Sequence, residues 1–125
     1  TSLNERLQKQ GKLILPRVEG STLTLFHVTT PLETAVIHNR WNIAEPDPSL
    51  CRTINPGELS CALIPAIAYD SKHHRLGYGK GFYDQLLASM PPSIPTYGLG
   101  FHEQYLHDPL PISPHDISLS ALLLF

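Results

Sequence analysis

A chain of 125 residues, 42% of them hydrophobic, is long enough to bury one core and short for two ordinary domains. The formal net charge is −2 and the nine Lys and Arg residues are scattered, which argues against a nucleic-acid groove and against an anionic membrane surface. No apolar run could span a bilayer, and Cys51 and Cys61 form neither a disulfide framework nor a zinc ribbon. We therefore expect a cytoplasmic protein that binds a small molecule.

The first 28 residues predict a helix followed by a hairpin. Ser2 and Glu5 are spaced as a capping box and Gly11 supplies a stop, so we expect a helix over residues 3–10. Residues 12–18 predict a buried strand, and residues 22–28 alternate as a half-buried strand does. The turn between them favours pairing of the two strands.

The pattern weakens between residues 31 and 58. A helical turn over residues 32–37 precedes a loop that holds three prolines and Trp41, the only tryptophan. Long loops in compact domains often carry function. From the residues alone, Trp41 either fills a small satellite core or takes part in the function of this loop.

The second half alternates strands with a helix. Residues 61–68 form an apolar run typical of a central strand covered on both faces, and Pro65 implies a bulge or a strand end within it. We expect a helix over residues 82–90 and strands over residues 96–101 and 117–125. This order predicts an α/β fold, a three-layer sandwich with a mostly parallel central sheet.

The stretch R-L-G-Y-G-K-G-F-Y-D at residues 75–84 joins strand to helix. Its glycines, Gly77, Gly79 and Gly81, leave the backbone bare, and two cations, Arg75 and Lys80, flank it. Free N–H groups at the positive end of a helix suit a phosphate. The segment matches neither G-x-x-x-x-G-K-[ST] nor G-x-G-x-x-G, and a tight turn with a solvated lysine is the alternative.

This stretch, together with L-I-P-A-I-A-Y-D at residues 63–70, resembles the hallmark of the 5-formyltetrahydrofolate cyclo-ligases, also called 5,10-methenyltetrahydrofolate synthetases. Weaker pieces follow in the family's order: G-K-L-I-L-P-R at 11–17, W-N-I-A-E-P at 41–46, G-F-H-E-Q at 100–104 and H-D-I-S-L-S at 115–120. The resemblance implies one cyclo-ligase-like domain over residues 1–125, with a fold similar to sugar-phosphate isomerase and CoA-transferase domains.

The resemblance also implies an activity: ATP- and Mg²⁺-dependent cyclisation of 5-formyltetrahydrofolate to 5,10-methenyltetrahydrofolate, with release of ADP and phosphate. Phosphoryl transfer needs mainly positioning and charge neutralisation. Arg75 and Lys80 are the implied catalytic cations. The implied ATP contacts are Arg75, Leu76, Gly77, Tyr78, Gly79, Lys80, Gly81, Phe82 and Tyr83. The implied folate contacts are Trp41, Tyr78, Gly79, Lys80, Gly81 and Phe82, and the implied Mg²⁺ ligands are Asp84 and Asp116.

The residues by themselves allow plainer interpretations. Phe82 at a helix start is more often a core residue, Asp84 suits the positive end of the helix dipole, and Asp116 is a loop acid. The seven histidines, including the pair His73 and His74, lack the spacing of a transition-metal site.

Two departures from the family leave a second function open. Thr1 falls where the family's E-x-x-T stretch ends, so the preceding segment is missing from this sequence, and Ser120 stands where many members have Asp. The first departure favours a catalytically impaired remnant that binds nucleotide or folate, as monomer or weak dimer, and turns over poorly.

Overall fold

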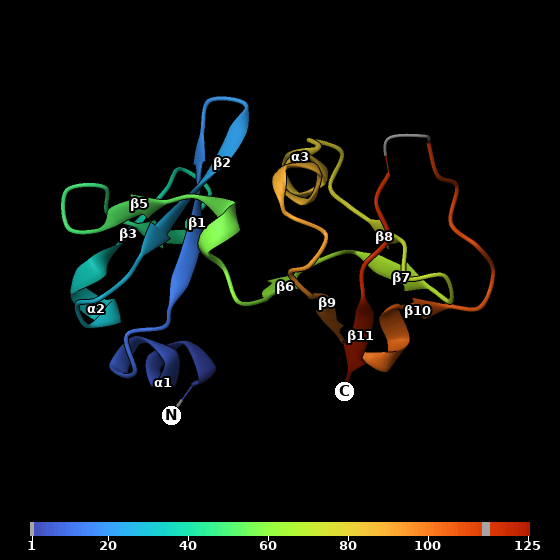
Figure 1. Ribbon diagram of the computed structural model, residues 1–125, viewed down its shortest axis with the longest axis horizontal. Helices are drawn as coiled ribbons and strands as arrows, with labels where there is room; N and C mark the ends of the chain where they lie inside the picture. The colour runs from blue at the N-terminus through green and yellow to red at the C-terminus, as the bar shows by residue number, and fades with distance from the viewer. Residues whose placement is uncertain (1, 114–115) are drawn as a thin grey trace. The chain divides into compact units, whose positions relative to one another are not determined.

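The computed structural model describes residues 2–113 and 116–125. The chain divides into two compact units, Thr1–Asn55, which runs from blue to green in Figure 1, and Pro56–Phe125, which runs from green to red. The single domain expected over residues 1–125 stays a prediction. None of the helices in the described residues is long and apolar enough to cross a membrane.

The first unit is built on the predicted helix and hairpin. Helix α1 (Leu3–Lys9) begins at Ser2, whose hydroxyl accepts the Glu5 N–H at 3.2 Å, as the capping pattern requires. Strands β1 (Ile14–Glu19) and β2 (Thr22–His27) pair antiparallel, and β5 (Arg52–Ile54) adds to the other side of β2. Their core consists of Leu13, Phe26, Val28, Ala35 and Cys51. The predicted helix and the predicted hairpin are confirmed.

The segment expected to be mainly loop contains a second hairpin. After α2 (Leu32–Ala35), β3 (Val36–His38) pairs antiparallel with β4 (Ala44–Pro46). The turn between them is closed by Asn39, whose side-chain oxygen accepts the N–H groups of Trp41 and Ile43 at 2.9 and 3.1 Å. Asn42 takes a left-handed conformation with φ 59°, which asparagine tolerates better than most residues. The expectation of a loop here was wrong because short polar turns of this kind carry no apolar periodicity.

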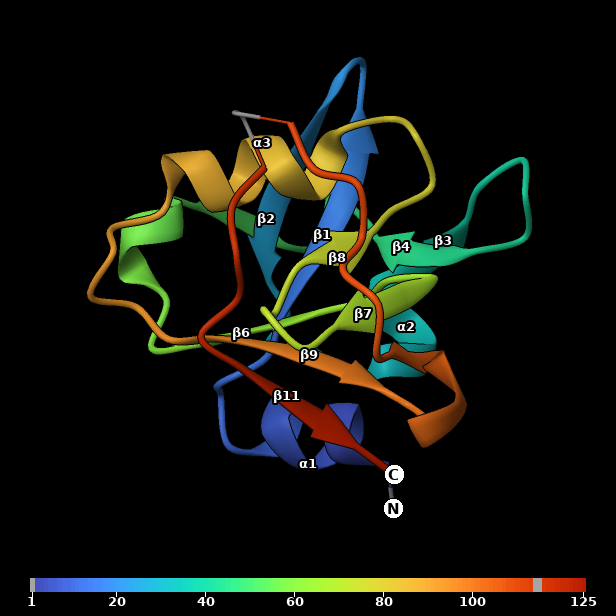
Figure 2. The same cartoon turned by 90° about the vertical axis from the view of Figure 1, so that its right-hand side faces the viewer.

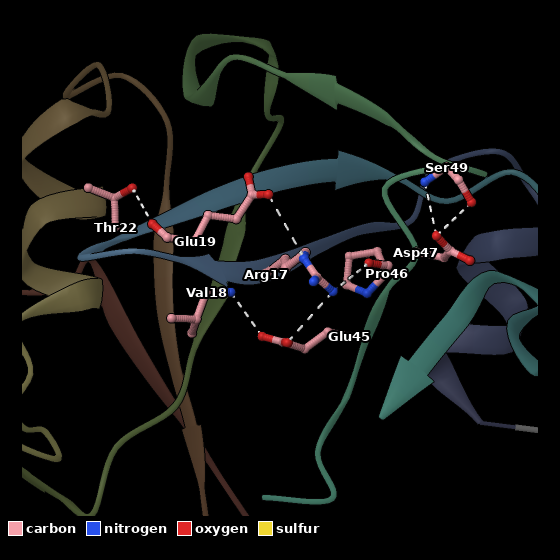
Figure 3. A network of polar contacts seen from close by, with 8 residues as sticks. All are labelled: Arg17, Val18, Glu19, Thr22, Glu45, Pro46, Asp47 and Ser49. Carbon is pink, nitrogen blue, oxygen red and sulfur yellow. Dashed lines mark hydrogen bonds and ion pairs between the residues drawn. The ribbon is translucent and has the colours of Figure 1, made fainter. Parts of the chain in front are cut away.

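A buried carboxylate fastens β4 to the outer edge of β1 (Figure 3). Glu45 accepts the Val18 N–H at 2.9 Å, a donor that points away from β2. The Arg17 guanidinium lies 3.9 Å from the other Glu45 oxygen and donates to the Pro46 carbonyl at 3.5 Å. Glu45 therefore satisfies a partly buried edge N–H that has no strand partner on that side.

Replacing Glu45 with alanine should lower the free energy of unfolding by about 1–2 kcal/mol, because it leaves the Val18 N–H without its acceptor. Glu45→Gln retains an oxygen at that place and should recover most of the loss. Urea unfolding followed by circular dichroism measures both variants. Equal stability of the alanine variant and the original chain would show that water replaces the carboxylate without cost.

The second unit contains a parallel sheet. Strands β6 (Ala62–Ile64), β9 (Thr96–Gly100) and β11 (Ala121–Leu124) run parallel with β9 in the centre. The Ser120 hydroxyl accepts the Thr96 N–H at 2.9 Å, so it acts locally where β9 and β11 begin. The predicted α/β class with parallel strands is confirmed, and the three-layer sandwich stays a prediction.

The predicted strand over residues 61–68 is split at Pro65. Strand β6 ends at Ile64, and β7 (Ala68–Asp70) belongs to another sheet, between β8 (Arg75–Leu76) and β10 (Tyr105–Leu106). Strands β7 and β10 are parallel, whereas β7 and β8 are antiparallel. Three further helical elements are η1 (Pro56–Glu58), α3 (Phe82–Ser89) and η2 (His102–Gln104). The expected strand end at Pro65 and the expected helix are confirmed.

Tyr69 connects these two sheets. It is fully buried, and its ring occupies space that a Cβ at Gly98 or Gly100 would enter, at 2.5 and 3.1 Å. Its hydroxyl lies 2.7 Å from the Ile64 carbonyl and 2.9 Å from the Leu99 carbonyl. The glycines of β9 therefore form a slot that fits one aromatic ring.

Candidate functional site

The glycine-rich segment forms an exposed loop between β8 and α3 (Figure 2). Gly79 and Gly81 have φ of +89° and +73°, where a side chain would be strained although space is free around each position. Tyr78 is 71% exposed at the tip. Lys80 is exposed as well, and it makes no hydrogen bond or ion pair within the described residues. The loop thus presents bare backbone, a ring and a cation to solvent.

Helix α3 begins at this loop without a side-chain cap. Gly81 is the N-cap residue and has no side-chain oxygen with which to accept a first-turn N–H. The first N–H groups of a helix lack partners within the helix. They therefore remain available to an anion at the positive end of the dipole, with Lys80 next to them.

Arg75 points into the unit rather than out to solvent. Its side chain is only 5% exposed, and its Nε donates to the Pro65 carbonyl at 3.0 Å. One terminal nitrogen lies 3.5 Å from the Asp84 carboxylate, and the guanidinium carbon lies 5.3 Å from the centre of the Tyr83 ring. Arg75 therefore fastens the first turn of α3 to the break between β6 and β7. The predicted contact between Arg75 and ATP phosphates stays a prediction.

Gly77 has different surroundings from the other two glycines of the loop. A Cβ at this position would lie 2.9 Å from a terminal nitrogen of Arg75, so the guanidinium lies over the bare Cα. Burial raises the pKa of the Tyr83 hydroxyl, and nearby Arg75 only partly opposes this. Tyr83 is accordingly a neutral ring beside the guanidinium at neutral pH. Phe82, at the start of α3, is only half-buried.

The two predicted Mg²⁺ ligands have different surroundings. The Asp84 side chain is 38% exposed and pairs with Arg75, whereas Asp116 lies in an exposed segment and accepts the Ser113 N–H at 2.7 Å. No group of three His, Cys, Asp or Glu side chains in the described residues is arranged around a common metal position. Two carboxylates suit Mg²⁺, because this ion usually takes one or two carboxylates and completes its shell with water and phosphate oxygens.

Trp41 lies in the first unit, at the tip of the β3–β4 hairpin. It is 59% exposed, and the Arg40 guanidinium carbon lies 4.1 Å from the centre of its ring. The interpretation of Trp41 as a core plug is therefore wrong. A contact between Trp41 and folate stays a prediction.

Sequence reasoning gave no role to Asp70, a buried acid at the end of β7. Its carboxylate is fully buried and accepts the N–H groups of Lys72, His74 and Leu110, each at 2.9 Å. His74 Nδ1 lies 3.3 Å from the oxygen that Leu110 contacts. Burial would raise the pKa of Asp70, but the hydrogen bonds outweigh it and hold that pKa below its usual value. An acid at the end of an apolar strand was the available signal.

The chain is similar in sequence and structure to known folate enzymes. Residues 2–124 match the 5-formyltetrahydrofolate cyclo-ligase family. The probable 5-formyltetrahydrofolate cyclo-ligase of Schizosaccharomyces pombe is 33% identical, over 92% of this chain and 62% of its own length. The 5-formyltetrahydrofolate cyclo-ligase of Escherichia coli K12 is 30% identical, over 97% of this chain and 68% of its own.

A solved structure agrees with this match. The NMR structure of Aquifex aeolicus 5,10-methenyltetrahydrofolate synthetase superposes with a TM-score of 0.76 at 31% identity, covering 94% of this chain and 57% of that one. This chain thus spans about six tenths of the length of such relatives. The match over nearly every residue shows that the chain belongs to the 5-formyltetrahydrofolate cyclo-ligase family.

Proposed function

We propose that this chain binds Mg-ATP and 5-formyltetrahydrofolate and takes part in their conversion to 5,10-methenyltetrahydrofolate, ADP and phosphate. The observation that carries the proposal is the exposed loop of residues 77–81, which leads into an uncapped helix N-terminus beside an unpaired lysine in the described chain. Such a loop offers N–H donors and positive charge to the phosphates. Family membership supports the choice of this reaction.

In this reaction the formyl oxygen attacks the γ-phosphorus, and the bond from that phosphorus to the ADP oxygen breaks. N10 of the folate then attacks the activated carbon and releases its proton to solvent, and the former formyl oxygen leaves with phosphate. The work that falls to the protein is to hold the two substrates close together and to neutralise the phosphate charge. Lys80 and the backbone of the loop would hold the phosphates, Tyr78 and Phe82 offer ring faces, and Trp41 would contact the folate.

Asp84 and Asp116 would hold Mg²⁺, which supplies charge neutralisation on the phosphates when it is bound. Their hard oxygens fit this ion, and the exposure of Asp84 leaves room for a cation beside it. Arg75 would keep Asp84 and the first turn of α3 in place.

Replacing Lys80 with alanine should weaken ATP binding by about 2 kcal/mol, or roughly thirtyfold in Kd, the scale of one charge-assisted hydrogen bond. Lys80 is exposed, so stability should not change. Isothermal titration calorimetry with Mg-ATP measures the effect, and Lys9→Ala, another exposed lysine, is the matched control. An unchanged Kd for the Lys80 variant would remove the loop from the ATP site.

Turnover separates the ligase from the binding-only alternative. The absorbance of 5,10-methenyltetrahydrofolate is followed after Mg-ATP is added to the chain with 5-formyltetrahydrofolate. Product formation that Lys80→Ala slows supports the ligase. Calorimetric binding of both substrates with no product would support a module that binds without turnover, and absence of binding would contradict the proposal altogether.

A further inference from the structure

Both predicted Mg²⁺ ligands lie on segments that are attached to one tight turn. This turn, residues 71–74, joins β7 to β8 and so directly precedes Arg75 and the glycine-rich loop that leads to Asp84. On the chain between β10 and β11, which carries Asp116, Leu110 is bonded to Asp70 at the end of β7 and Leu119 is bonded to His73 in the turn.

Two backbone donors, one on each side of Asp116, are bonded to this turn or to the residue before it. Leu110 N–H donates to Asp70 at 2.9 Å, and Leu119 N–H donates to the His73 carbonyl at 2.8 Å. Leu110 and Leu119 are themselves buried, at 9% and 3% exposed. Both bonds depend on the shape of the turn, in which His73 has the left-handed φ of 63°.

Asp70 sets that shape. One of its oxygens accepts the N–H groups of Lys72 and His74 and closes the turn, while the other accepts Leu110 and lies near the His74 ring. We propose that Asp70 is a positioning residue, whose carboxylate holds the Asp116 segment against the turn that leads into the phosphate loop. This inference rests on the proposed function, because it treats Asp84 and Asp116 as ligands of one Mg²⁺.

The Asp70→Asn variant distinguishes the hydrogen bonds that close the turn from the hydrogen bond to Leu110. The asparagine amide has a single acceptor oxygen. If this oxygen faces Lys72 and His74, it keeps two backbone hydrogen bonds, whereas it keeps only one if it faces Leu110. The first orientation is therefore expected. The amide NH₂ then meets the Leu110 N–H, donor against donor. The variant should therefore keep the turn and the loop but release the Leu110 side.

The substitution is expected to change the Kd for Mg-ATP but not the Kd for metal-free ATP. In EDTA, ATP should bind the Asp70→Asn chain and the original chain with Kd values within about twofold, because the loop is retained. With Mg²⁺ the variant should bind about tenfold more weakly than the original chain, the scale of one lost hydrogen bond to a charged group. His74→Ala removes only the ring contact and is the matched control, with little change in either condition.

Three outcomes would overturn the inference. Equal Mg-ATP affinity for the variant and the original chain would show that Asp70 does not position the metal ligands. Equal weakening with and without Mg²⁺ would show a general structural role. Failure of the original chain itself to bind ATP would instead overturn the proposed function, and this inference with it.

A measurement on the original chain covers the case in which Asp70→Asn does not fold. Amide hydrogen exchange of Leu110 and Leu119 should slow when Mg-ATP is added and should not respond to ATP in EDTA. Exchange in residues 77–83 should slow with either form of the nucleotide. If Mg-ATP slows exchange in the loop and leaves Leu110 and Leu119 unchanged, the turn does not couple the two segments and the proposal is wrong.

Discussion

The Arg75→Ala variant should lose about 3 kcal/mol of unfolding free energy, the lower end of the range for breaking a buried ion pair, because Asp84 is partly exposed. It removes the bond to the Pro65 carbonyl and leaves Asp84 without its cation. The first turn of α3 should then move, so ATP binding should weaken as well. Arg75→Lys keeps the charge but lacks the planar fork that reaches both partners, and it should recover little of the stability.

Thermal unfolding and calorimetric titration of the same samples measure the two effects of the Arg75 variants. Arg6→Ala, an exposed arginine on α1, is the control and should change neither quantity. Weak ATP binding by an Arg75→Ala chain of normal stability would point to direct phosphate contact, and Arg75 would then turn outward when ATP binds.

The Gly98→Ala variant should lose about 3 kcal/mol, the upper end of the cost of overfilling a core. The new methyl group would lie 2.5 Å from the Tyr69 ring, 2.8 Å from Leu122 and 3.0 Å from Leu119. Tyr69 cannot easily yield, because its hydroxyl lies within hydrogen-bond distance of carbonyls on both β6 and β9. The expected result is a lower midpoint in urea with an unchanged slope.

Gly57→Ala is the matched control for this glycine. Its new methyl group would make one ordinary contact, 3.9 Å from the Pro91 side chain, so stability should stay within about 0.5 kcal/mol of the original. If Gly98→Ala unfolds at the same urea concentration as Gly57→Ala, the slot around Tyr69 adapts more easily than the packing indicates.

Elements specified by neighbouring residues could be predicted from the sequence. Helix α1 has its capping serine, α3 has a glycine before it and apolar residues at helical spacing, and the β1–β2 hairpin alternates. The β3–β4 hairpin and strand β10 were missed because they are short and depend on partners elsewhere in the fold. Pro65 marked the break within residues 61–68, but the transfer of β7 to a second sheet has no local signal.

The candidate site likewise has parts that could be predicted from the sequence and parts that could not. The loop of residues 77–81 and its place before a helix were predicted, since glycine spacing is a local property. The inward direction of Arg75 was not, because the sequence does not show that the Pro65 carbonyl would be free to accept it. Asp70 was overlooked for a similar reason: Leu110, one of its partners, is 40 residues away.

At the break around Pro65, the hydrogen bonds that hold the chain run from side chains to backbone carbonyls. Backbone carbonyls at Pro65, Ala66 and Ile67 accept the side chains of Arg75 and Gln104, at 3.0, 2.9 and 3.3 Å. Every amino acid has the same carbonyl, so the accepting side of this anchor does not depend on which side chains occupy these three positions. The donating side does depend on identity, because only a long planar side chain reaches from β8 or η2. These hydrogen bonds should therefore tolerate substitution at Ile67 better than at Arg75 or Gln104. Pro65 and Ala66 are constrained for other reasons, Pro65 because it directly follows the end of β6 and Ala66 because it is buried.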